Sequence, residues 1–337
     1  MAYKQTYLTG GTLMDFATVI YSYGGPDVLT YESVEVGAPG PGELRLRQTH
    51  IGVNYHDVYV RSGSYQTLSL PGIPGLEAVG FVEEVGGDVT GFKVGDRVVY
   101  LTAKYGAYAS SRIIPADIAI HLPDSVDGAT AAACYLKGLT VEMLLHKQTP
   151  IQPGSWVLIH AAAGGVGQLL VQKALKLGAN VIGTVGSAEK AALLREMGCD
   201  HTILYREVDF VEAVKKITQG RGVDVVFDSV GKDTFDGSIE VLALTGTLVN
   251  FGQSSGAIAP LDVAKLASKS LTLTRPIVFH YITARADLDN LSALLFSDLQ
   301  AGILRPEAPI TLALADASKA HSLLESRSTA QSIVLAV

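Results

Sequence analysis

A glycine-rich turn in the middle of the chain is the clearest candidate for chemistry. The apolar run 157–160 leads into residues 161–167, which read AAAGGVG, and a helical pattern follows. The spacing is that of G-x-G-x-x-G with Ala162 in the first position, then Gly164 and Gly167, and with Gly165 and Val166 inside the turn. Gly164 lets the backbone approach a pyrophosphate, and Gly167 lets the helix pack closely on its strand. The turn is therefore predicted to bind a dinucleotide at the start of the helix.

The elements around this turn decide between that interpretation and an ordinary strand-to-helix crossover. Short apolar segments predict strands at 156–160, 180–185, 201–204, 223–227, 247–251 and 270–274. Amphipathic stretches predict helices at 167–177, 189–197 and 209–218. The alternation is typical of an α/β fold with a doubly wound parallel sheet, a Rossmann-type lobe, and it favours dinucleotide binding.

The end of the second strand of this lobe bears on which dinucleotide is bound. An NAD site places an acidic side chain there, on the ribose 2′-hydroxyl, but residues 181–187 read VIGTVGS. Donors that can bind and neutralise a 2′-phosphate follow this strand and the next: Ser187, Lys190, Tyr205 and Arg206. NADPH is therefore predicted. The alternative is that Ser187 caps a helix and Lys190 is a solvated charge, and Glu189 counts against a phosphate.

The rest of the chain predicts a second lobe, because 337 residues exceed what one hydrophobic core usually holds. Apolar alternations at 43–53, 78–85 and 97–101, separated by Gly, Pro and Asp, indicate a compact β lobe. A helix-like stretch at 129–146 then leads to the second lobe. The tail, 309–337, reads as strand, helix and strand, and we expect it to return to the first lobe. The expected domains are 14–136 with 298–337, and 137–297.

Composition and charge argue against several kinds of partner. The formal net charge of −7 gives no reason to expect nucleic acid or an anionic membrane surface. Apolar runs are interrupted before the roughly 20 residues needed to span a bilayer, and the first 16 residues lack the apolar core of a signal peptide. Cys134 and Cys199 stand far apart and form no paired motif. A reducing, cytoplasmic setting is therefore expected.

Several further motifs accompany the glycine turn over nearly the whole chain. They are YGGP (23–26), GVNYHD (52–57), RSGSY (61–65), VGDRV (94–98), KGLT (137–140), DSVG (228–231) and FGQSSG (251–256). Jointly they resemble the medium-chain dehydrogenases/reductases and, within them, the zeta-crystallin-like NADPH:quinone oxidoreductases. The resemblance implies a GroES-like β lobe, a Rossmann lobe inserted after it, and a C-terminal return.

The resemblance also implies the residues of an active site. In the family the nicotinamide lies between the lobes, near 54–59. Asn54 and Thr140 would hold its amide, with Arg327 reaching back to the cofactor. The resemblance places Tyr59 and Tyr65 at the acceptor, where Tyr65 would hydrogen-bond the quinone oxygen as it gains charge, and packing between lobes is the alternative for both.

The expected catalytic residues are Tyr65, Tyr59 and Asn54. The expected cofactor-binding residues are Asn54, Tyr55, Asp57, Tyr59, Thr140, Ala162, Gly164, Gly165, Val166, Gly167, Gly186, Ser187, Lys190, Tyr205, Ser229, Phe251, Gly252, Gln253, Ser254, Pro276, Ile277, Val278 and Arg327.

No metal is expected, although the alcohol dehydrogenases of the same superfamily use zinc to polarise their substrate. Asn54 stands where those enzymes carry a cysteine ligand, and Leu76 where they carry a histidine ligand. Their four-cysteine structural site cannot be built from two cysteines. His56, Asp57 and Glu77 could gather a metal, but hydrogen-bonded structural roles are more common for such residues.

The leading functional hypothesis is reduction of a small-molecule quinone by NADPH, because a quinone spreads the incoming charge without help from a metal. Reduction of an activated C=C bond in an enal, enone or enoyl thioester needs the same hydride and stays open. A structural or RNA-binding role, as in some zeta-crystallin relatives, is disfavoured by the net charge. The Tyr-x-x-x-Lys spacing of Tyr100 and Lys104 is attributed to chance, since it precedes the glycine turn. In relatives the 271–273 strand pairs across a twofold axis, so a homodimer is expected.

Overall fold

The computed structural model describes residues 14–337, which belong to two compact units. The second unit is continuous, from Lys137 to Pro306, and the first comprises the chain before and after it. The sequence predicted the return to the first unit at residue 298, but residues 298–306 stay with the second. Asp298 is paired with Lys173, and the Arg305 backbone N–H donates to Gln172 Oε1 at 2.6 Å. These contacts hold the segment in the second unit.

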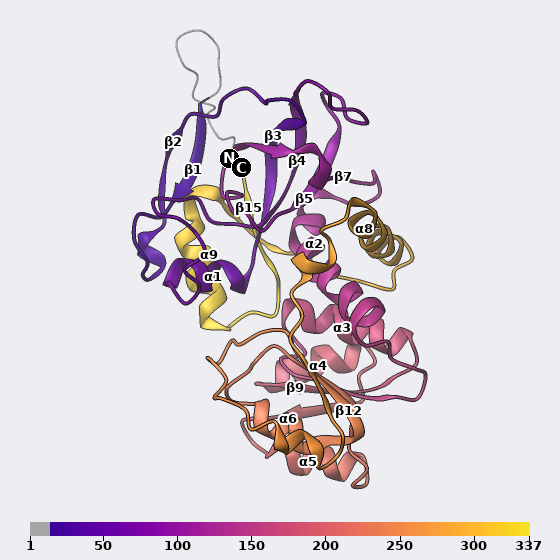
Figure 1. Ribbon diagram of the computed structural model, residues 1–337. Helices are drawn as coiled ribbons and strands as arrows, with labels where there is room; N and C mark the ends of the chain where they lie inside the picture. The colour runs from indigo at the N-terminus through magenta and orange to yellow at the C-terminus, as the bar shows by residue number, and fades with distance from the viewer. Residues whose placement is uncertain (1–13) are drawn as a thin grey trace. The chain divides into compact units, whose positions relative to one another are not determined.

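The second unit contains a six-stranded parallel sheet (Figure 1). In spatial order its strands are β10 (His201–Leu204), β9 (Asn180–Val185), β8 (Trp156–Ile159), β11 (Val223–Asp228), β12 (Leu242–Asn250) and β13 (Thr272–Thr274). The chain winds outward from β8 in one direction and from β11 in the other. The boundary between β8 and β11 is therefore the switch point at which folds of this kind bind ligands. The predicted doubly wound sheet is confirmed.

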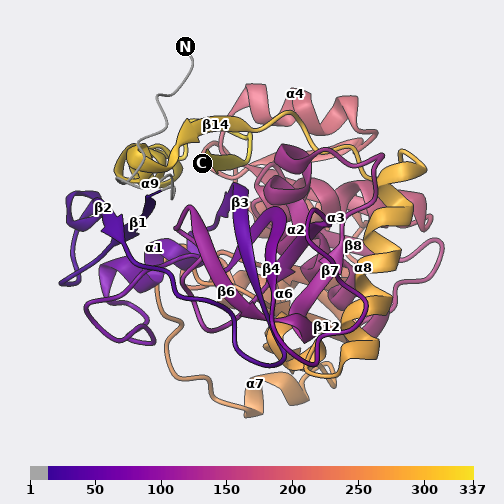
Figure 2. The same cartoon turned by 90° about the horizontal axis from the view of Figure 1, so that it is seen from above.

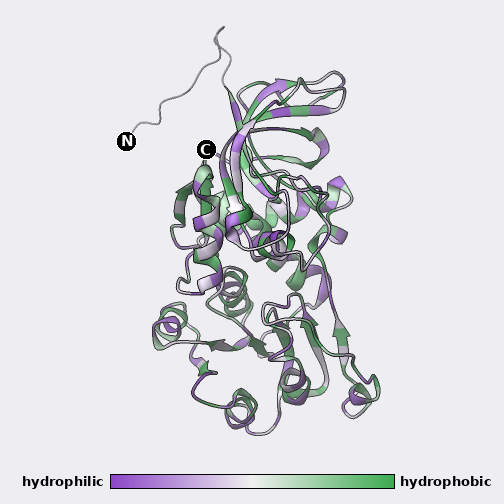
Figure 3. Ribbon diagram, turned by 90° about the vertical axis from the view of Figure 1, so that its left-hand side faces the viewer, coloured by the Kyte–Doolittle hydropathy of each residue, from purple (hydrophilic) through white to green (hydrophobic). Residues whose placement is uncertain are grey.

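Helices connect these strands. They are α3 (Gly165–Lys176), α4 (Ala188–Glu196), α5 (Phe210–Ile217), α6 (Phe235–Val241), α7 (Ala264–Ala267) and α8 (Arg285–Gln300). The strands form because they are apolar on both faces: Leu158, Ile182, Val226 and Leu248 are fully or almost fully buried. Figure 3, coloured by hydropathy, shows green hydrophobic stretches along strands of the protein.

The first unit is built on a seven-stranded sheet. Its strands are β14 (Ile310–Ala313), β15 (Ile333–Ala336), β3 (Glu43–Val53), β4 (Glu77–Val85), β5 (Arg97–Leu101) and β7 (Ala119–His121), with β6 (Ser111–Pro115) also paired to β3. Figure 2 shows β3, β4 and β6 side by side. β1 (Asp15–Val19) and β2 (Thr30–Val34) form a separate antiparallel pair. Leu44 and Leu46 alternate with more exposed residues along β3 and are fully buried, as the alternation predicted.

The C-terminal tail returns to the first unit, as predicted. β15 pairs antiparallel with β3, and β14 pairs parallel with β15. Between them, α9 (Ala317–Ser326) lies against α1 (Tyr55–Ser62), where the Arg61 guanidinium forms two hydrogen bonds of 2.8 and 2.9 Å with the Glu325 carboxylate. Within residues 14–337, no helix is long and apolar enough to cross a membrane.

Two helical elements mark the passage between the units. α2 (Gly128–Glu142) contains the boundary at residues 136 and 137, and a π-helix, η3 (Met143–Gln148), continues from its end. The sequence predicted one helix over 129–146. The change of winding begins directly after Glu142, whose side chain is completely buried.

Candidate active site

The glycine turn lies between β8 and α3, at the switch point of the parallel sheet. Gly164 is the N-cap of α3 and has no side chain to occupy the first N–H groups of the helix. At Gly167 a Cβ atom would lie 2.4 Å from Ala161 O and 2.7 Å from Ala162 O. This confirms the predicted close packing at Gly167. A helix start free of a capping side chain fits the pyrophosphate of a dinucleotide.

Ala162, which replaces the first glycine of the motif, is accommodated by a glycine on the neighbouring strand. Its backbone N–H donates to Thr184 O at 3.1 Å, and its side chain is buried. A Cβ atom at Gly183 would lie 2.9 Å from the Cβ atom of Ala162. Gly183 therefore provides the space that Ala162 fills. The sequence analysis did not single out Gly183, because this contact depends on the pairing of β8 with β9.

The residues predicted for a 2′-phosphate gather beyond β9 and β10. A Cβ atom at Gly186 would lie 2.9 Å from Tyr205 Oη and 3.4 Å from Arg206 Nε, so Gly186 lets both side chains approach the end of β9. Ser187 accepts a hydrogen bond from the Lys190 backbone N–H at 3.4 Å and caps α4. The N-cap alternative for Ser187 is thus observed, and it places Lys190 in the first turn of the same helix. A helix start also attracts a phosphate.

Glu189 lies in that first turn too. Hydrogen bonds from its own backbone and from the Ser187 side chain lower the pKa of its exposed carboxyl group. The residue therefore carries a negative charge at neutral pH. It remains the one feature of this corner that opposes a phosphate group.

The loops that follow β11 and β12 are joined to each other. Asp228 Oδ1 accepts hydrogen bonds from the Val230 N–H at 2.7 Å and the Gly231 N–H at 3.1 Å. Ser254 N–H donates to Ser229 O at 3.1 Å, and a Cβ atom at Gly252 would lie 2.7 Å from the same oxygen. The structure thus brings Ser229 together with residues 251–254.

Five predicted groups of residues therefore follow the carboxyl ends of strands in one parallel sheet. They are the glycine turn after β8, residues 186–190 after β9, Tyr205 after β10, Ser229 with residues 251–254 after β11 and β12, and Pro276 to Val278 after β13. Val278 is buried and Ile277 is half exposed. Thr140 does not follow a strand; it lies within α2 with a buried side chain.

In the first unit, α1 begins directly after β3 and carries the remaining predicted residues. Asn54 is its N-cap, and the Asn54 Nδ2 amide donates to Glu77 Oε1 at 2.7 Å. The other oxygen of Glu77 accepts the Leu136 backbone N–H at 2.6 Å. Both side chains are buried, so Glu77 determines the orientation of the Asn54 amide.

Asp57, predicted as a cofactor contact, lies inside the first unit. Its carboxylate is completely buried and accepts hydrogen bonds from the Asn54 backbone N–H at 2.8 Å and from Tyr108 Oη at 3.2 Å. These contacts give Asp57 a structural role at the start of α1, and its contact with the cofactor stays a prediction. Among residues 14–337, no three His, Cys, Asp or Glu side chains are grouped to hold a metal.

The predicted tyrosines form an aromatic cluster. The ring centroids of Tyr59 and Tyr65 are 4.9 Å apart, and Tyr55 contacts Tyr59 edge-on at 5.3 Å. The cluster also contains His56, whose ring contacts Tyr65 edge-on at 5.5 Å. Burial lowers the pKa of His56 to about 4, so the imidazole is neutral at neutral pH. Arg327 follows α9 in the left-handed conformation, with φ of 54°.

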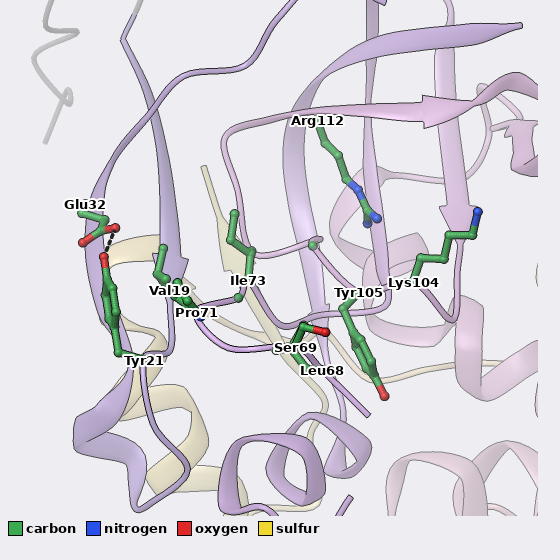
Figure 4. A pocket seen from close by; sticks show the side chains of 12 residues that line it. Val19, Tyr21, Glu32, Leu68, Ser69, Pro71, Ile73, Lys104, Tyr105 and Arg112 are labelled. Carbon is green, nitrogen blue, oxygen red and sulfur yellow. Dashed lines mark hydrogen bonds between the residues drawn. The ribbon is translucent and has the colours of Figure 1, made fainter. Parts of the chain in front are cut away.

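An open pocket of about 540 Å³ lies beside this cluster in the first unit (Figure 4). The ring of Tyr105 lines it, together with the cationic side chains Lys104 and Arg112. On another part of its lining, Tyr21 donates a hydrogen bond to Glu32 at 2.8 Å. Neither Tyr105 nor the pocket was predicted from the sequence, because residues 19–32, 68–73 and 104–112 meet only in the folded unit.

Comparison with known proteins covers both units. Residues 40–124 match the family model of the alcohol dehydrogenase GroES-like domain, and residues 165–297 match the model of zinc-binding dehydrogenases. The chain is 45% identical to a 2-haloacrylate reductase of a Burkholderia species, over 96% of this chain and 99% of that protein. It is 44% identical to quinone oxidoreductase 1 of Escherichia coli, over 94% and 97%.

Solved structures agree with these matches. The crystal structure of Escherichia coli quinone oxidoreductase complexed with NADPH superposes with a TM-score of 0.93, at 43% identity, over 96% of this chain and 100% of that one. The crystal structure of a 2-haloacrylate reductase gives a TM-score of 0.86, at 44% identity, over 96% and 99%. The similarity therefore extends over the whole architecture.

Proposed function

This chain belongs to the zeta-crystallin-like quinone oxidoreductases of the medium-chain dehydrogenase/reductase superfamily, and we propose that it reduces quinones with NADPH. The observation that carries the proposal is the set of loops at the carboxyl edge of the parallel sheet, with a glycine turn at the switch point where folds of this kind bind ligands. When bound, NADPH supplies the hydride. The residues of the protein bind and orient the two reactants.

The second unit would hold the cofactor. The uncapped start of α3 suits the pyrophosphate, and Ser187, Lys190 and Tyr205 suit the 2′-phosphate. Lys190→Ala is expected to raise the KM for NADPH about tenfold or more, because a hydrogen bond to a charged group contributes about 1.5–3 kcal/mol. The KM for NADH should hardly change. The matched control is Lys176→Ala, which removes a lysine at the end of α3 that is farthest from the glycine turn. Equal effects on both cofactors would contradict the 2′-phosphate site.

The first unit would hold the acceptor on Tyr59 and Tyr65. We propose that the Tyr65 hydroxyl donates a hydrogen bond to the quinone oxygen as that oxygen gains negative charge. Asn54 and Leu76 occupy the positions of two zinc ligands in the alcohol dehydrogenases, and the Asn54 amide donates to Glu77, so the reaction needs no zinc. Unchanged turnover in Tyr65→Phe would remove this hydroxyl from the mechanism.

An NADPH oxidation assay tests the function directly. A panel of quinones, enals, enoyl thioesters and 2-haloacrylates is compared by kcat/KM, with NADH as the alternative donor. Turnover of quinones with a preference for NADPH is expected. A second candidate, reduction of an activated C=C bond, is favoured by the 45% identity to a 2-haloacrylate reductase. If no quinone is reduced and an unsaturated substrate is, the second candidate replaces the first.

We also propose that the protein is a homodimer in the cytoplasm. β13 is an edge strand of the parallel sheet, and Thr272 on it is exposed. Sedimentation equilibrium should give about twice the 35.5 kDa of one chain. Thr272→Lys should weaken the dimer by placing like charges across the edge, whereas Leu244→Lys, at another exposed position, should not. A monomer at micromolar concentration would contradict the proposal. Cys134 and Cys199 are buried and form no disulfide with each other, which suits a reducing compartment.

A further inference from the structure

A chain of hydrogen-bonding side chains leads from the aromatic cluster of the first unit to its surface. His56 Nε2 and Tyr105 Oη are 3.2 Å apart, and Tyr105 Oη is hydrogen-bonded to Thr67 Oγ1. His56 is partly buried, Tyr105 is 7% exposed and Thr67 is exposed. The ring of Tyr105 also lines the open pocket in Figure 4. These hydrogen bonds therefore connect solvent with His56, whose ring contacts Tyr65.

The backbone at Tyr105 is strained in the way that functional sites often are. Its φ is 50°, in the left-handed region that large side chains rarely adopt. Gly106, which follows, has φ of 94°. Such a conformation is unfavourable at a bulky residue and persists only where the surroundings enforce it. Here it puts the hydroxyl between His56 and Thr67.

The ionisation of these groups suits the passage of a proton. Burial keeps His56 neutral by lowering its pKa, so one ring nitrogen can accept a proton while the other donates one. Burial likewise raises the pKa of Tyr105, and its hydroxyl stays protonated. Within residues 14–337, His56 Nδ1 makes no hydrogen bond. The rings that face His56 are Tyr65 and Tyr105, and no charged side chain shifts its pKa.

We propose that Thr67, Tyr105 and His56 deliver to the acceptor the proton that must accompany the hydride. The inference rests on the proposed function. A quinone becomes a hydroquinone by gaining two electrons with the hydride, while NADPH is oxidised to NADP⁺, and by gaining one proton. The His56 Nδ1–H bond breaks as the quinone O–H bond forms. Nε2 then takes the proton of Tyr105, Tyr105 takes that of Thr67, and Thr67 takes one from water or buffer. Exchange with water restores the first tautomer of the ring.

His56 is thus assigned as a catalytic residue, and Tyr105 and Thr67 act through it. The same path would serve the reduction of a C=C bond, where the proton forms a C–H bond to the carbon that has not received the hydride. In either reaction, the path matters only after hydride transfer has made the acceptor negative. Its loss should therefore slow protonation and leave cofactor binding unchanged.

Tyr105→Phe removes one hydroxyl and tests the path. In the intact enzyme with a quinone, we expect its kcat to fall at least tenfold, since a positioned acid contributes about 10²- to 10⁴-fold. The solvent deuterium isotope effect on kcat should rise, and the isotope effect of NADPH deuterated at C4 should fall towards unity. The Kd for NADPH, from cofactor fluorescence, should be unchanged. Tyr21→Phe removes a hydroxyl from the lining of the same pocket and is the matched control.

His56→Ala provides a second test, because added imidazole should restore part of its kcat but should not accelerate Tyr21→Phe. Thr67→Val changes an exposed side chain and should reproduce the isotope effects of Tyr105→Phe in weaker form. If His56→Ala does not fold, Tyr105→Phe and Thr67→Val still decide the matter. Wild-type kcat and isotope effects in those two variants would overturn the path alone. If none of the acceptors offered to the wild-type enzyme supports the oxidation of NADPH, the proposed function itself is overturned.

Discussion

Two glycines of the same turn restrict the structure in different ways. A Cβ atom at Gly167 would meet the carbonyl oxygens of Ala161 and Ala162 at 2.4 and 2.7 Å, so part of the backbone would have to move. A Cβ atom at Gly164 would lie 3.1 Å from Ala161 O and would otherwise face the predicted pyrophosphate. Gly167 is therefore required by packing inside the protein, whereas Gly164 is predicted to serve the ligand.

Gly167→Ala is therefore expected to lower the free energy of unfolding by about 1–3 kcal/mol, as overpacking generally does. Gly164→Ala should leave that free energy nearly unchanged and weaken NADPH binding. Urea denaturation and fluorescence titration measure the two effects. Gly87→Ala, where a Cβ atom would meet nothing within 4 Å, is the control. If Gly164→Ala lost stability and kept its affinity, the assignment of the two glycines would be reversed.

Single residues were predicted well where a motif surrounds them and poorly where a distant contact decides their role. The motif correctly identified Gly167 as the position of close packing. The cofactor contact of Asp57 stays a prediction, and the hydrogen bond that its carboxylate accepts from Tyr108, 51 positions away, could not be foreseen. His56 and Tyr105 are 49 positions apart, and no spacing rule connects them.

At the scale of elements, the junction of α2 with the π-helix η3 is the clearest site of unbalanced charge. The completely buried Glu142 lies 3.4 Å from Lys173 Nζ on α3 and 3.1 Å from His146 Nε2 on η3. Lys173 is also paired with Asp298 on α8. Two buried carboxylates thus share one lysine beside the π-helical turn.

This cluster predicts how stability depends on pH. Burial raises the pKa of Glu142 from 4.5 to about 7, with Lys173 opposing the rise and Asp298 adding to it. The folded state therefore holds a proton that the unfolded state releases near pH 4.5. This proton therefore contributes about 3 kcal/mol to the free energy of unfolding. The contribution is complete below pH 4.5 and is lost as the pH rises through 7.

Glu142→Gln should remove most of this dependence, because the amide resembles the protonated acid. The variant is expected to match the wild type near pH 5 and to exceed its free energy of unfolding at pH 8.5. Urea denaturation at the two pH values measures the difference. Glu196→Gln, at an exposed position of α4, should keep the wild-type dependence. A wild-type slope in Glu142→Gln would show that another group titrates.

Most of the elements for which the sequence predicted bounds lie within one or two residues of those bounds, because they follow from local periodicity. β3 and β5 have the predicted bounds. β12 begins at Leu242, five residues before the predicted start, because an irregular register with β11 and a positive φ of 59° at Thr245 interrupt its apolar pattern. The π-helix follows the buried Glu142, which lies against Lys173 on α3, and the local pattern of the sequence did not predict it.

For the molecule as a whole, cofactor binding should raise stability by mass action. NADPH binds only the folded state. At 100 times its Kd it should therefore add about 2.7 kcal/mol to the free energy of unfolding. Hydrogen exchange should slow most at 161–167 and 186–190, at the carboxyl edge of the second unit's sheet, and little at 111–121. NADH at the same concentration should give a smaller shift. Equal shifts for both dinucleotides would contradict selectivity for the 2′-phosphate.

The sequence by itself determined the two-lobed α/β architecture, the parallel sheet, the C-terminal return and the glycine turn at the switch point of that sheet. Each depends on the local order of apolar, polar and glycine residues, which can be interpreted one segment at a time. Only the tertiary structure decided that Gly183 makes room for Ala162, that Asp57 is buried under Tyr108, and that Thr67 and Tyr105 connect His56 with solvent. These relations come from packing between segments far apart in the chain, which local periodicity does not encode.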